Sequence, residues 1–318
     1  MWSARETLMT DMGRTEAFWT APVRSSLSEL AGAGIEIVRP CQFSFPGKIL
    51  TPVDDLLVPL VADSALDDLL GRSGIAGVLT TRALAEHIPE RMGLAIADDP
   101  MRAHHEIHLA LSRIPGRLWR DFPSEIDPQA SIHPTAWVAP RNVRIGAGVA
   151  VLPHAVVHER SAIEEGSRIH SQAVVGGDAY EIVMIEGRQV LRPQTGGVLI
   201  GRNCEIMTGA IVTRSAFCGA TVIGDNSVLD CNVTISHDCR IADDVRIGGS
   251  SWIGGRVTIG AKASLGPNCT IGNGLTIGSA AKISLGAVVT KDVCDGEHVS
   301  GNFAIKHERL LDHLRRIR

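Results

Sequence analysis

Between positions 223 and 289, every sixth residue of the chain is aliphatic. A repeat of six matches neither the period of a helix nor the simple alternation of a strand. It matches a solenoid in which three short strands, six residues apart, form one triangular coil of eighteen residues. The aliphatic residue would fill the narrow interior, and the glycine that often follows it would permit a tight corner. The aliphatic positions are Ile223, Leu229, Ile235, Ile241, Ile247, Ile253, Ile259, Leu265, Ile271, Ile277, Ile283 and Val289.

The six-residue repeat begins earlier in the chain, at Ile132 and Val138, and slips by one residue before it continues at Ile145. It predicts a mainly β repeat domain over residues 130–295. The segment 176–197 interrupts the register, and we interpret it as a loop that leaves the solenoid. Long insertions in rigid repeat proteins often carry function. This insertion contains the single tyrosine of the chain, Tyr180.

A different pattern precedes the repeats. Over residues 41–115, apolar runs of strand length alternate with helical segments, which predicts a small α/β domain. Its last helix is expected to begin after Asp99, which caps it, with Pro100 at the first helical position. Residues 1–40 give a weaker signal and form an N-terminal extension. Residues 300–318 predict a short basic helix at the other end.

The composition narrows the class of protein. A net charge of −4 argues against a general nucleic-acid binder. No apolar run approaches the roughly 18 residues of a membrane span, and no signal-peptide core is visible near the start. The chain has seven cysteines, and Cys204, Cys239 and Cys269 occupy the small interior position of their repeats. We expect them to be reduced packing residues in a cytoplasmic protein.

His237 stands at a corner position that should project outward from the coil, and no structural demand for a histidine is visible there. One coil later, Gly255 would lie over His237 at strand spacing, about 4.8 Å. The imidazole could take a proton from an attacking amine or hydroxyl. The backbone N–H of Gly255 could stabilise the oxyanion of a thioester. This pair favours acyl transfer, and an ordinary surface histidine is the alternative.

Histidines elsewhere raise the question of a metal site. His104, His105 and His108 fall on the last predicted helix of the α/β domain, and we interpret them as a packed or solvated face. A zinc enzyme on a similar solenoid, the γ-type carbonic anhydrase, needs three histidines at one metal ion. Between positions 176 and 295 the only histidine is His237. We therefore expect no metal site within one subunit, while a site shared between subunits stays open.

Four longer segments occur in order along the chain. They are IHPTAWVAP at 132–140, RPQTGGVLIG at 192–201, LDCNVTISHDCRI at 229–241 and SGNFAIKHERLL at 300–311. Together they resemble the UDP-3-O-acylglucosamine N-acyltransferases of lipid A biosynthesis, which are hexapeptide-repeat acyltransferases. The resemblance covers about residues 40–318 and is stronger from position 132 onward.

The resemblance implies a left-handed parallel β-helix and a homotrimer with active sites between neighbouring subunits. It places the general base on His237 and the oxyanion glycine on Gly255. The co-substrate would be an acyl thioester, carried by acyl carrier protein or coenzyme A, and no metal or bound cofactor is implied. The acceptor would be a small amino sugar, contacted by Tyr180, Gln194, Asp238 and Gly274.

The chain departs from that family in three places. Gly274 stands where the family has a second histidine, and the glycine- and phenylalanine-rich loop is reduced to residues 176–180. The stretch LVPLVADSALDD at 57–68 has no aromatic residue where the family grips the uracil. We therefore carry three hypotheses. They are an N-acyltransferase for an amino sugar, an acyl-CoA-dependent transferase for another acceptor (an amine or a hydroxyl), and a non-catalytic scaffold.

Overall fold

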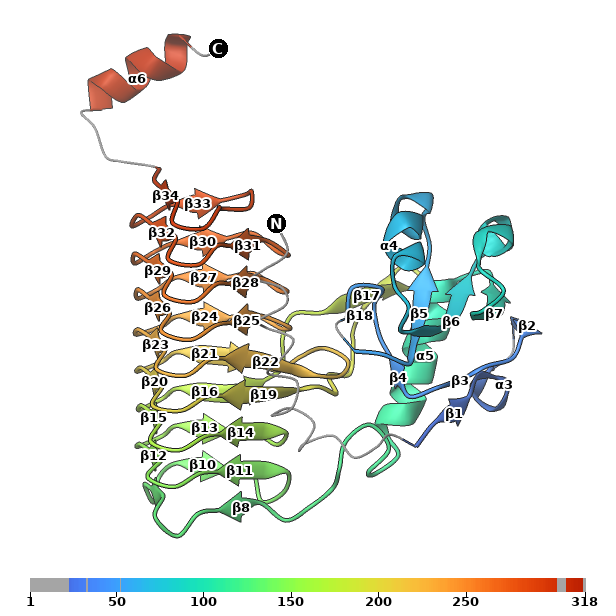
Figure 1. Ribbon diagram of the computed structural model, residues 1–318, viewed down its shortest axis with the longest axis horizontal. Helices are drawn as coiled ribbons and strands as arrows, with labels where there is room; N and C mark the ends of the chain where they lie inside the picture. Colours follow the sequence, from blue (N-terminus) through green and yellow to red (C-terminus); the bar gives the residue numbers. More distant parts are fainter. Residues whose placement is uncertain (1–22, 33, 52, 302–306, 317–318) are drawn as a thin grey trace.

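A computed structural model describes residues 23–32, 34–51, 53–301 and 307–316. It has two parts, a tall parallel β-helix and a smaller α/β domain beside it (Figure 1). The mainly β architecture with three long parallel sheets confirms the expected fold class and agrees with a left-handed β-helix of hexapeptide repeats. The N-terminal extension lies largely outside the described residues.

Three parallel sheets form the faces of the β-helix, and we call them sheets I, II and III. Sheet I contains β10 (Trp137–Val138), β13 (Val156–Val157), β16 (Val174–Gly177), β21 (Ile211–Thr213), β24 (Thr234–Ile235), β27 (Trp252–Ile253), β30 (Thr270–Ile271) and β33 (Val288–Val289). Sheet II contains β8 (Glu125–Ile126), β11 (Val143–Ile145), β14 (Ser161–Ile163), β19 (Gly197–Ile200), β22 (Ala220–Ile223), β25 (Arg240–Ile241), β28 (Thr258–Ile259) and β31 (Thr276–Ile277). Sheet III contains β9 (Ser131–Ile132), β12 (Ala150–Val151), β15 (Arg168–Ile169), β20 (Glu205–Ile206), β23 (Val228–Leu229), β26 (Arg246–Ile247), β29 (Ser264–Leu265), β32 (Lys282–Ile283) and β34 (His298–Val299).

The solenoid is slightly longer than residues 130–295. Its first paired strand is β8 and its last is β34, which pairs with β32. Ile126 of β8 precedes Ile132 by six residues, so the register extends one repeat further toward the N-terminus than expected. The boundaries therefore move outward at both ends.

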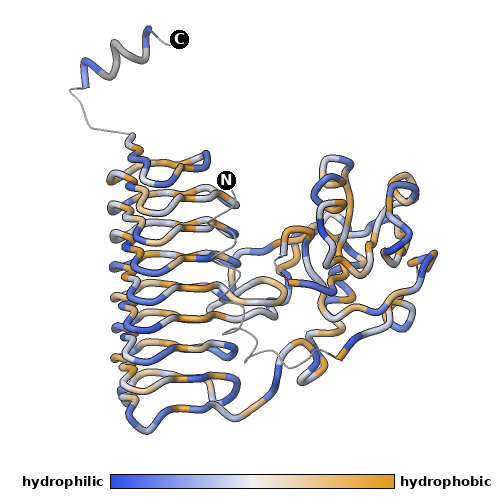
Figure 2. Tube along the Cα trace, in the orientation of Figure 1, coloured by the Kyte–Doolittle hydropathy of each residue, from blue (hydrophilic) through white to orange (hydrophobic). Residues whose placement is uncertain are grey.

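The aliphatic residue of each repeat fills the core, as the spacing predicts. Ile235 is fully buried, and apolar and polar segments alternate along each coil (Figure 2). Cys204, Cys239 and Cys269 are also buried in this core, each just before a strand of a different sheet. Burial raises the pKa of the Cys239 thiol to about 12, so this sulfur is held as a packed, unreactive thiol.

The glycines that follow the aliphatic positions act differently from the expectation. Gly224 and Gly260 do not adopt a positive φ. A Cβ on Gly224 would lie 2.5 Å from the backbone of Ala242, and one on Gly260 would lie 2.5 Å from the backbone of Ser279, both on the next coil. The left-handed conformation falls two residues later, as at Asn226 with a φ of 58°. Glycine is therefore needed for the close approach of neighbouring coils and not for the corner itself.

The α/β domain is built on a five-stranded sheet with the order β2-β7-β6-β5-β4. Strand β2 pairs with β7, so the domain begins before residue 41 and takes in part of the expected N-terminal extension. The sequence placed this boundary too late because β2 is an edge strand whose residues alternate between half-buried and exposed, with none fully buried. The strands are β1 (Ser25–Ser26), β2 (Ile35–Arg39), β3 (Gln42–Phe43), β4 (Phe45–Pro46), β5 (Leu56–Leu60), β6 (Ile75–Thr80) and β7 (Gly93–Ala97).

Short helices and one long helix complete this domain. The long helix α5 (Pro100–Ser112) begins as expected, because the Asp99 side chain accepts a hydrogen bond from the Arg102 N–H at 2.9 Å. Ile107 and Leu111 of α5 are buried in the domain core. The short helices are α3 (Leu27–Leu30), η1 (Asp63–Ala65), α4 (Leu66–Leu70) and η2 (Arg82–His87).

Two loops of the β-helix join the two parts of the molecule. The long insertion forms an antiparallel hairpin of β17 (Ile182–Ile185) and β18 (Arg188–Leu191). Its Glu186 pairs with Arg102 of α5 at 2.5 Å. The shorter loop between β21 and β22 places Phe217 in the core of the α/β domain. These contacts fix the α/β domain against the corner between sheets I and II.

The described C-terminal segment is the helix α6 (His307–Arg316), which falls within the expected basic tail. Over the part of the chain that the structure describes, no helix combines the length and the apolar character needed to cross a membrane.

Candidate functional site

His237 lies on the corner between β24 of sheet I and β25 of sheet II. The long insertion leaves the solenoid at the same corner two coils earlier, and the 214–219 loop leaves one coil earlier. Gly255 and Asn273 occupy the equivalent position on the next two coils. The six-residue repeat thus stacks five segments at one edge of the solenoid.

The neighbouring carboxylate holds the His237 ring. Nδ1 of His237 lies 2.6 Å from Oδ2 of Asp238, and His237 is only 8% exposed. Asp238 has the left-handed φ of 61° that this corner position takes in most coils. Because the carboxylate is an acceptor, the neutral ring carries its proton on Nδ1 and leaves the lone pair on Nε2. This is the form in which a histidine acts as a base.

The shorter loop and the start of β22 hold Asp238 in turn. Its Oδ1 accepts hydrogen bonds from the Ser215 hydroxyl and from the Ala216 N–H, the latter at 3.3 Å. Its own N–H donates to Oγ1 of Thr221 at 2.9 Å. Burial opposes a charge on Asp238, but the hydrogen bonds from His237, Ser215 and Ala216 outweigh it and hold the pKa of this carboxyl below its usual value. Asp238 is therefore an ionised group that orients the imidazole.

A second carboxylate faces the other ring nitrogen. Oε2 of Glu181 lies 3.5 Å from Nε2 of His237, and each of the two side chains is 10% exposed. The other oxygen of Glu181 pairs with Nζ of Lys48 at 2.5 Å. Glu181 comes from the long insertion and Lys48 from the segment between β4 and β5. The α/β domain therefore reaches the histidine through this ion pair.

Gly255 lies against the imidazole, as the stacking argument predicts. A Cβ on Gly255 would lie 2.6 Å from Nε2 of His237, so any other residue would collide with the ring. The Gly255 N–H that could stabilise an oxyanion already has a partner, because it donates to Oδ1 of Asn273 at 2.8 Å. Asn273 stands directly above Gly255 on the next coil.

The other expected contact residues have different environments. Tyr180 is 82% exposed on the insertion and is free to contact a ligand. Both polar atoms of the buried Gln194 bind the backbone of Ala179, at 3.0 and 2.6 Å, so this side chain closes the loop. Gly274 has a left-handed φ of 72° at the corner position that Asp238 takes two coils earlier. Gln194 therefore closes the loop and Gly274 forms a corner of the coil. Asp238 contacts the ring of His237.

The three histidines of α5 form a packed face, one of the two alternatives expected. Nε2 of His104 bonds to the Leu57 carbonyl at 3.2 Å, and Nε2 of His108 lies 2.7 Å from Oγ1 of Thr195. Burial, followed by the neighbouring Arg192, lowers the pKa of His108 to about 3. Among the described residues, no three His, Cys, Asp or Glu side chains come together as metal ligands.

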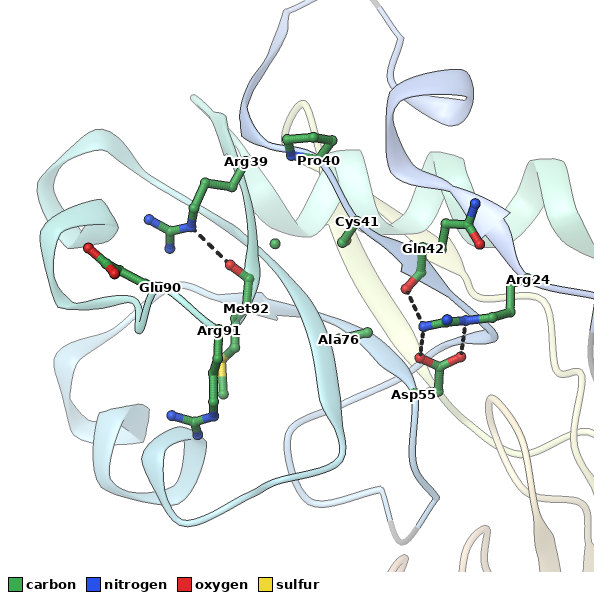
Figure 3. A pocket seen from close by; sticks show the side chains of 11 residues that line it. Arg24, Arg39, Pro40, Cys41, Gln42, Asp55, Ala76, Glu90, Arg91 and Met92 are labelled. Carbon is green, nitrogen blue, oxygen red and sulfur yellow. Dashed lines mark hydrogen bonds and ion pairs between the residues drawn. The ribbon is translucent and has the colours of Figure 1, made fainter.

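A separate recess of about 350 Å³ lies in the α/β domain, near the ends of β2 and β7 (Figure 3). Arginines line it, but two of them already have partners. Arg24 forms two hydrogen bonds with Asp55, at 2.9 and 2.7 Å, and Nε of Arg39 donates to the Met92 carbonyl at 3.0 Å. The recess is also lined by the Cys41 thiol, which is a poor nucleophile because burial, followed by the charge of Asp55, raises its pKa.

Sequence reasoning missed Glu181, Lys48 and Asn273. Glu181 follows Tyr180 directly in the insertion, and a charged residue beside the only tyrosine was the one available signal. Lys48 lies far from the repeats along the chain, and its position depends on how the two parts of the molecule dock. Asn273 could have been found by adding one coil to Gly255.

Known protein families match the repeat region. The model of the bacterial transferase hexapeptide (six repeats) matches residues 220–255. The model of the hexapeptide repeat of succinyl-transferase matches residues 240–279 and 256–291. These matches confirm that the solenoid is made of hexapeptide repeats.

Two named relatives resemble larger parts of the chain. The acyl-[acyl-carrier-protein]–UDP-N-acetylglucosamine O-acyltransferase of Rhizobium johnstonii is 34% identical over 105 residues, which are 31% of this chain and 35% of that protein. The UDP-3-O-acylglucosamine N-acyltransferase of Leptothrix cholodnii is 26% identical over 225 residues, which are 59% of this chain and 63% of that protein. The chain thus spans about a third of the first relative and less than two thirds of the second. These relatives confirm the resemblance to the hexapeptide-repeat acyltransferases.

A solved structure has a related shape. The UDP-N-acetylglucosamine acyltransferase of Francisella novicida matches with a TM-score of 0.48 at 24% identity, and the match covers 60% of this chain and 71% of that chain.

Proposed function

We propose that this protein transfers an acyl group from an acyl-carrier-protein thioester to the amine of a nucleotide-linked amino sugar, with His237 as the general base. The observation that carries the proposal is the 2.6 Å contact between Nδ1 of His237 and the ionised Asp238. It fixes the tautomer that leaves Nε2 free to accept a proton. The names of the relatives, which act on UDP-linked glucosamines, support the donor and acceptor classes.

The reaction follows from the positions of the side chains. Nε2 of His237 takes a proton from the acceptor nitrogen as that nitrogen attacks the thioester carbon. The Asn273 side chain rotates away from Gly255, and the released N–H donates to the oxyanion. The C–S bond then breaks, and the imidazolium returns its proton to the departing sulfur. Asp238 stabilises the imidazolium between these two steps.

The assembly that we propose is a homotrimer with the site at a subunit boundary. The first residue of each sheet I strand faces outward, and none of these residues is charged: Trp137, Val156, Val174, Ile211, Thr234, Trp252, Thr270 and Val288. Trp137 is 48% exposed and Val288 is 58% exposed. Exposed apolar side chains on one uncharged face favour an interaction site there. Because His237 lies at the edge of sheet I, a neighbouring subunit on this sheet would border the site. The cytoplasmic location stays a prediction.

The acceptor is the point on which a second function differs. The Rhizobium relative is named as an O-acyltransferase, which favours a hydroxyl acceptor on the same scaffold. An acyl-CoA donor would be a further variation. Both alternatives use His237 in the same way, so the acceptor and donor have to be identified by assay.

Mass spectrometry tests the proposal directly. The protein would be given acyl carrier protein loaded with chains of different lengths, acyl-CoA in parallel, and UDP-3-O-acylglucosamine or UDP-N-acetylglucosamine as acceptor. We expect an amide product from the first sugar and a loss of about 100-fold or more in kcat in His237→Ala. His133→Ala, an exposed histidine far from the site, is the control. Normal turnover in His237→Ala, or no product from any donor, would refute the function.

A further inference from the structure

His237 lies between two carboxylates, one at each ring nitrogen. Asp238 accepts the hydrogen of Nδ1 at 2.6 Å. Oε2 of Glu181 faces Nε2 at 3.5 Å, a distance longer than a hydrogen bond. Proposed catalysis uses Asp238 and Nε2 but gives no role to Glu181. A buried carboxylate aimed at the lone pair of the base therefore needs its own explanation.

Counting hydrogens narrows that explanation. With the ring hydrogen on Nδ1, both Nε2 and the Glu181 carboxylate are acceptors. A group bound between them must donate to both at once. A primary ammonium has three hydrogens and a positive charge, whereas a hydroxyl has one hydrogen and no charge. Because Nε2 of His237 and Oε2 of Glu181 are 3.5 Å apart, one nitrogen can lie about 2.8 Å from both atoms.

Within the chain, Lys48 already provides an ammonium group that Glu181 binds. Its Nζ is a primary ammonium, and it binds the other oxygen of Glu181 at 2.5 Å. The Glu181 side chain is 10% exposed and that of Lys48 is 34% exposed. Water therefore screens the carboxylate weakly, and a charged hydrogen bond there is stronger than at the surface. Oε2 remains available on the side of Nε2.

We propose that Glu181 binds the ammonium group of the acceptor and so selects an amine over a hydroxyl at this site. The inference rests on the proposed function, because it uses His237 as the base of acyl transfer. It assigns a substrate-binding role to a residue of the insertion and names the acceptor class as a primary amine.

The proton balance is complete with these groups. The bound ammonium first releases one proton to solvent and becomes an amine, which Glu181 still holds through an N–H. The amine nitrogen forms the C–N bond while Nε2 of His237 takes a proton from it, the second proton that this nitrogen loses. The C–S bond breaks, and this proton moves from Nε2 to the sulfur. The products are an amide, a free thiol and one proton in solution.

The kinetic test compares two acidic residues of the same insertion. Glu181→Gln keeps the shape and removes the charge, and we expect it to raise the KM for UDP-3-O-acylglucosamine at least about tenfold. Glu186→Gln is the matched control, since Glu186 pairs with Arg102 at the tip of the hairpin and its side chain is 69% exposed. An unchanged KM in Glu181→Gln, or an equal rise in both variants, would overturn the inference.

The variant Lys48→Met distinguishes two roles of Glu181, binding of the acceptor and anchoring of the insertion. If Glu181 binds the acceptor, removal of the competing Lys48 ammonium lowers the KM or leaves it unchanged. If Glu181 only anchors the insertion through Lys48, Lys48→Met and Glu181→Gln raise the KM alike, and the inference fails. A KM that rises in Glu181→Gln but not in Lys48→Met supports the inference.

A binding experiment keeps this inference separate from the proposed function. Glucosamine and N-acetylglucosamine would be titrated while the His237 ring resonance, assigned by its loss in His237→Ala, is followed by NMR. We expect glucosamine alone to shift it, in wild type and Glu186→Gln but not in Glu181→Gln. Equal shifts in Glu181→Gln, or none in wild type at saturating concentration, would refute the ammonium site. This readout requires no acyl transfer, so a missing product with a Glu181-dependent shift would refute only the transferase.

Discussion

Sheets I and III are built from the same repeat but present different residues to the outside. In both sheets the second residue of the strand fills the shared core, as Ile235 does in sheet I and Ile247 in sheet III. The outward column of sheet I is uncharged along its whole length. That of sheet III contains Ser131, Ala150, Arg168, Glu205, Val228, Arg246, Ser264, Lys282 and His298.

The difference between the two outward columns indicates that the residues that fold the coil are not those that assemble the subunits. Coil formation needs only the inward residue and the small residues at the corners, so the outward residue of each strand is free to vary. A charged column such as that of sheet III suits contact with water. An uncharged column with Trp252 41% exposed suits contact with another protein surface. Three predictions test this contrast, in order of expected effect.

The largest effect is expected from a charge placed in the outward column of sheet I. Ile211→Asp would bury an aspartate in the proposed subunit contact, and an unpaired buried ion is strongly destabilising. We expect the trimer to dissociate into folded monomers, as measured by sedimentation velocity. Val228→Asp puts the same charge between Glu205 and Arg246 of sheet III and should leave the trimer intact. Dissociation in both variants, or in neither, would contradict the contrast.

An intermediate effect is expected inside the coil, where the two sheets should be alike. Ile235→Ala in sheet I and Ile247→Ala in sheet III each remove a buried side chain, and each should lower the free energy of unfolding by about 2–5 kcal/mol. Denaturant unfolding at one fixed protein concentration measures both. A much larger loss for either variant would mean that the two sheets differ in the core as well as on the surface.

The smallest effect is expected from the surface of sheet III. Arg246→Ala removes an exposed outward side chain and should change the free energy of unfolding by less than about 0.5 kcal/mol. The same denaturant measurement, together with sedimentation, checks it. Loss of assembly in this variant would show that sheet III also carries a subunit contact.

The sequence predicted the parts of the site that obey the repeat. Because coils of eighteen residues stack in register, His237 and Gly255 could be placed against each other from their spacing alone. The break in the register likewise located the insertion that reaches the site. The role predicted for the corner glycines was wrong, because spacing does not distinguish a positive φ from a close approach between coils.

The aperiodic parts of the chain could not be placed in this way. Gln194 was expected to contact the acceptor, but its side chain closes the loop on Ala179. The Gly255 N–H, which was expected to stabilise an oxyanion, donates to the side chain of Asn273. Whether a polar atom binds its own backbone or a ligand depends on side-chain geometry, which has no period in the sequence.

The sequence by itself determined the solenoid, its core and the edge on which the candidate base stands, since a strict period converts directly into position. Only the tertiary structure decided which residues from outside the repeat reach that base. Glu181 reaches Nε2 of His237 because the insertion folds back over the corner, and Lys48 joins it because the α/β domain docks on that insertion. These contacts depend on the packing of segments that are distant in sequence, and local sequence patterns do not predict that packing.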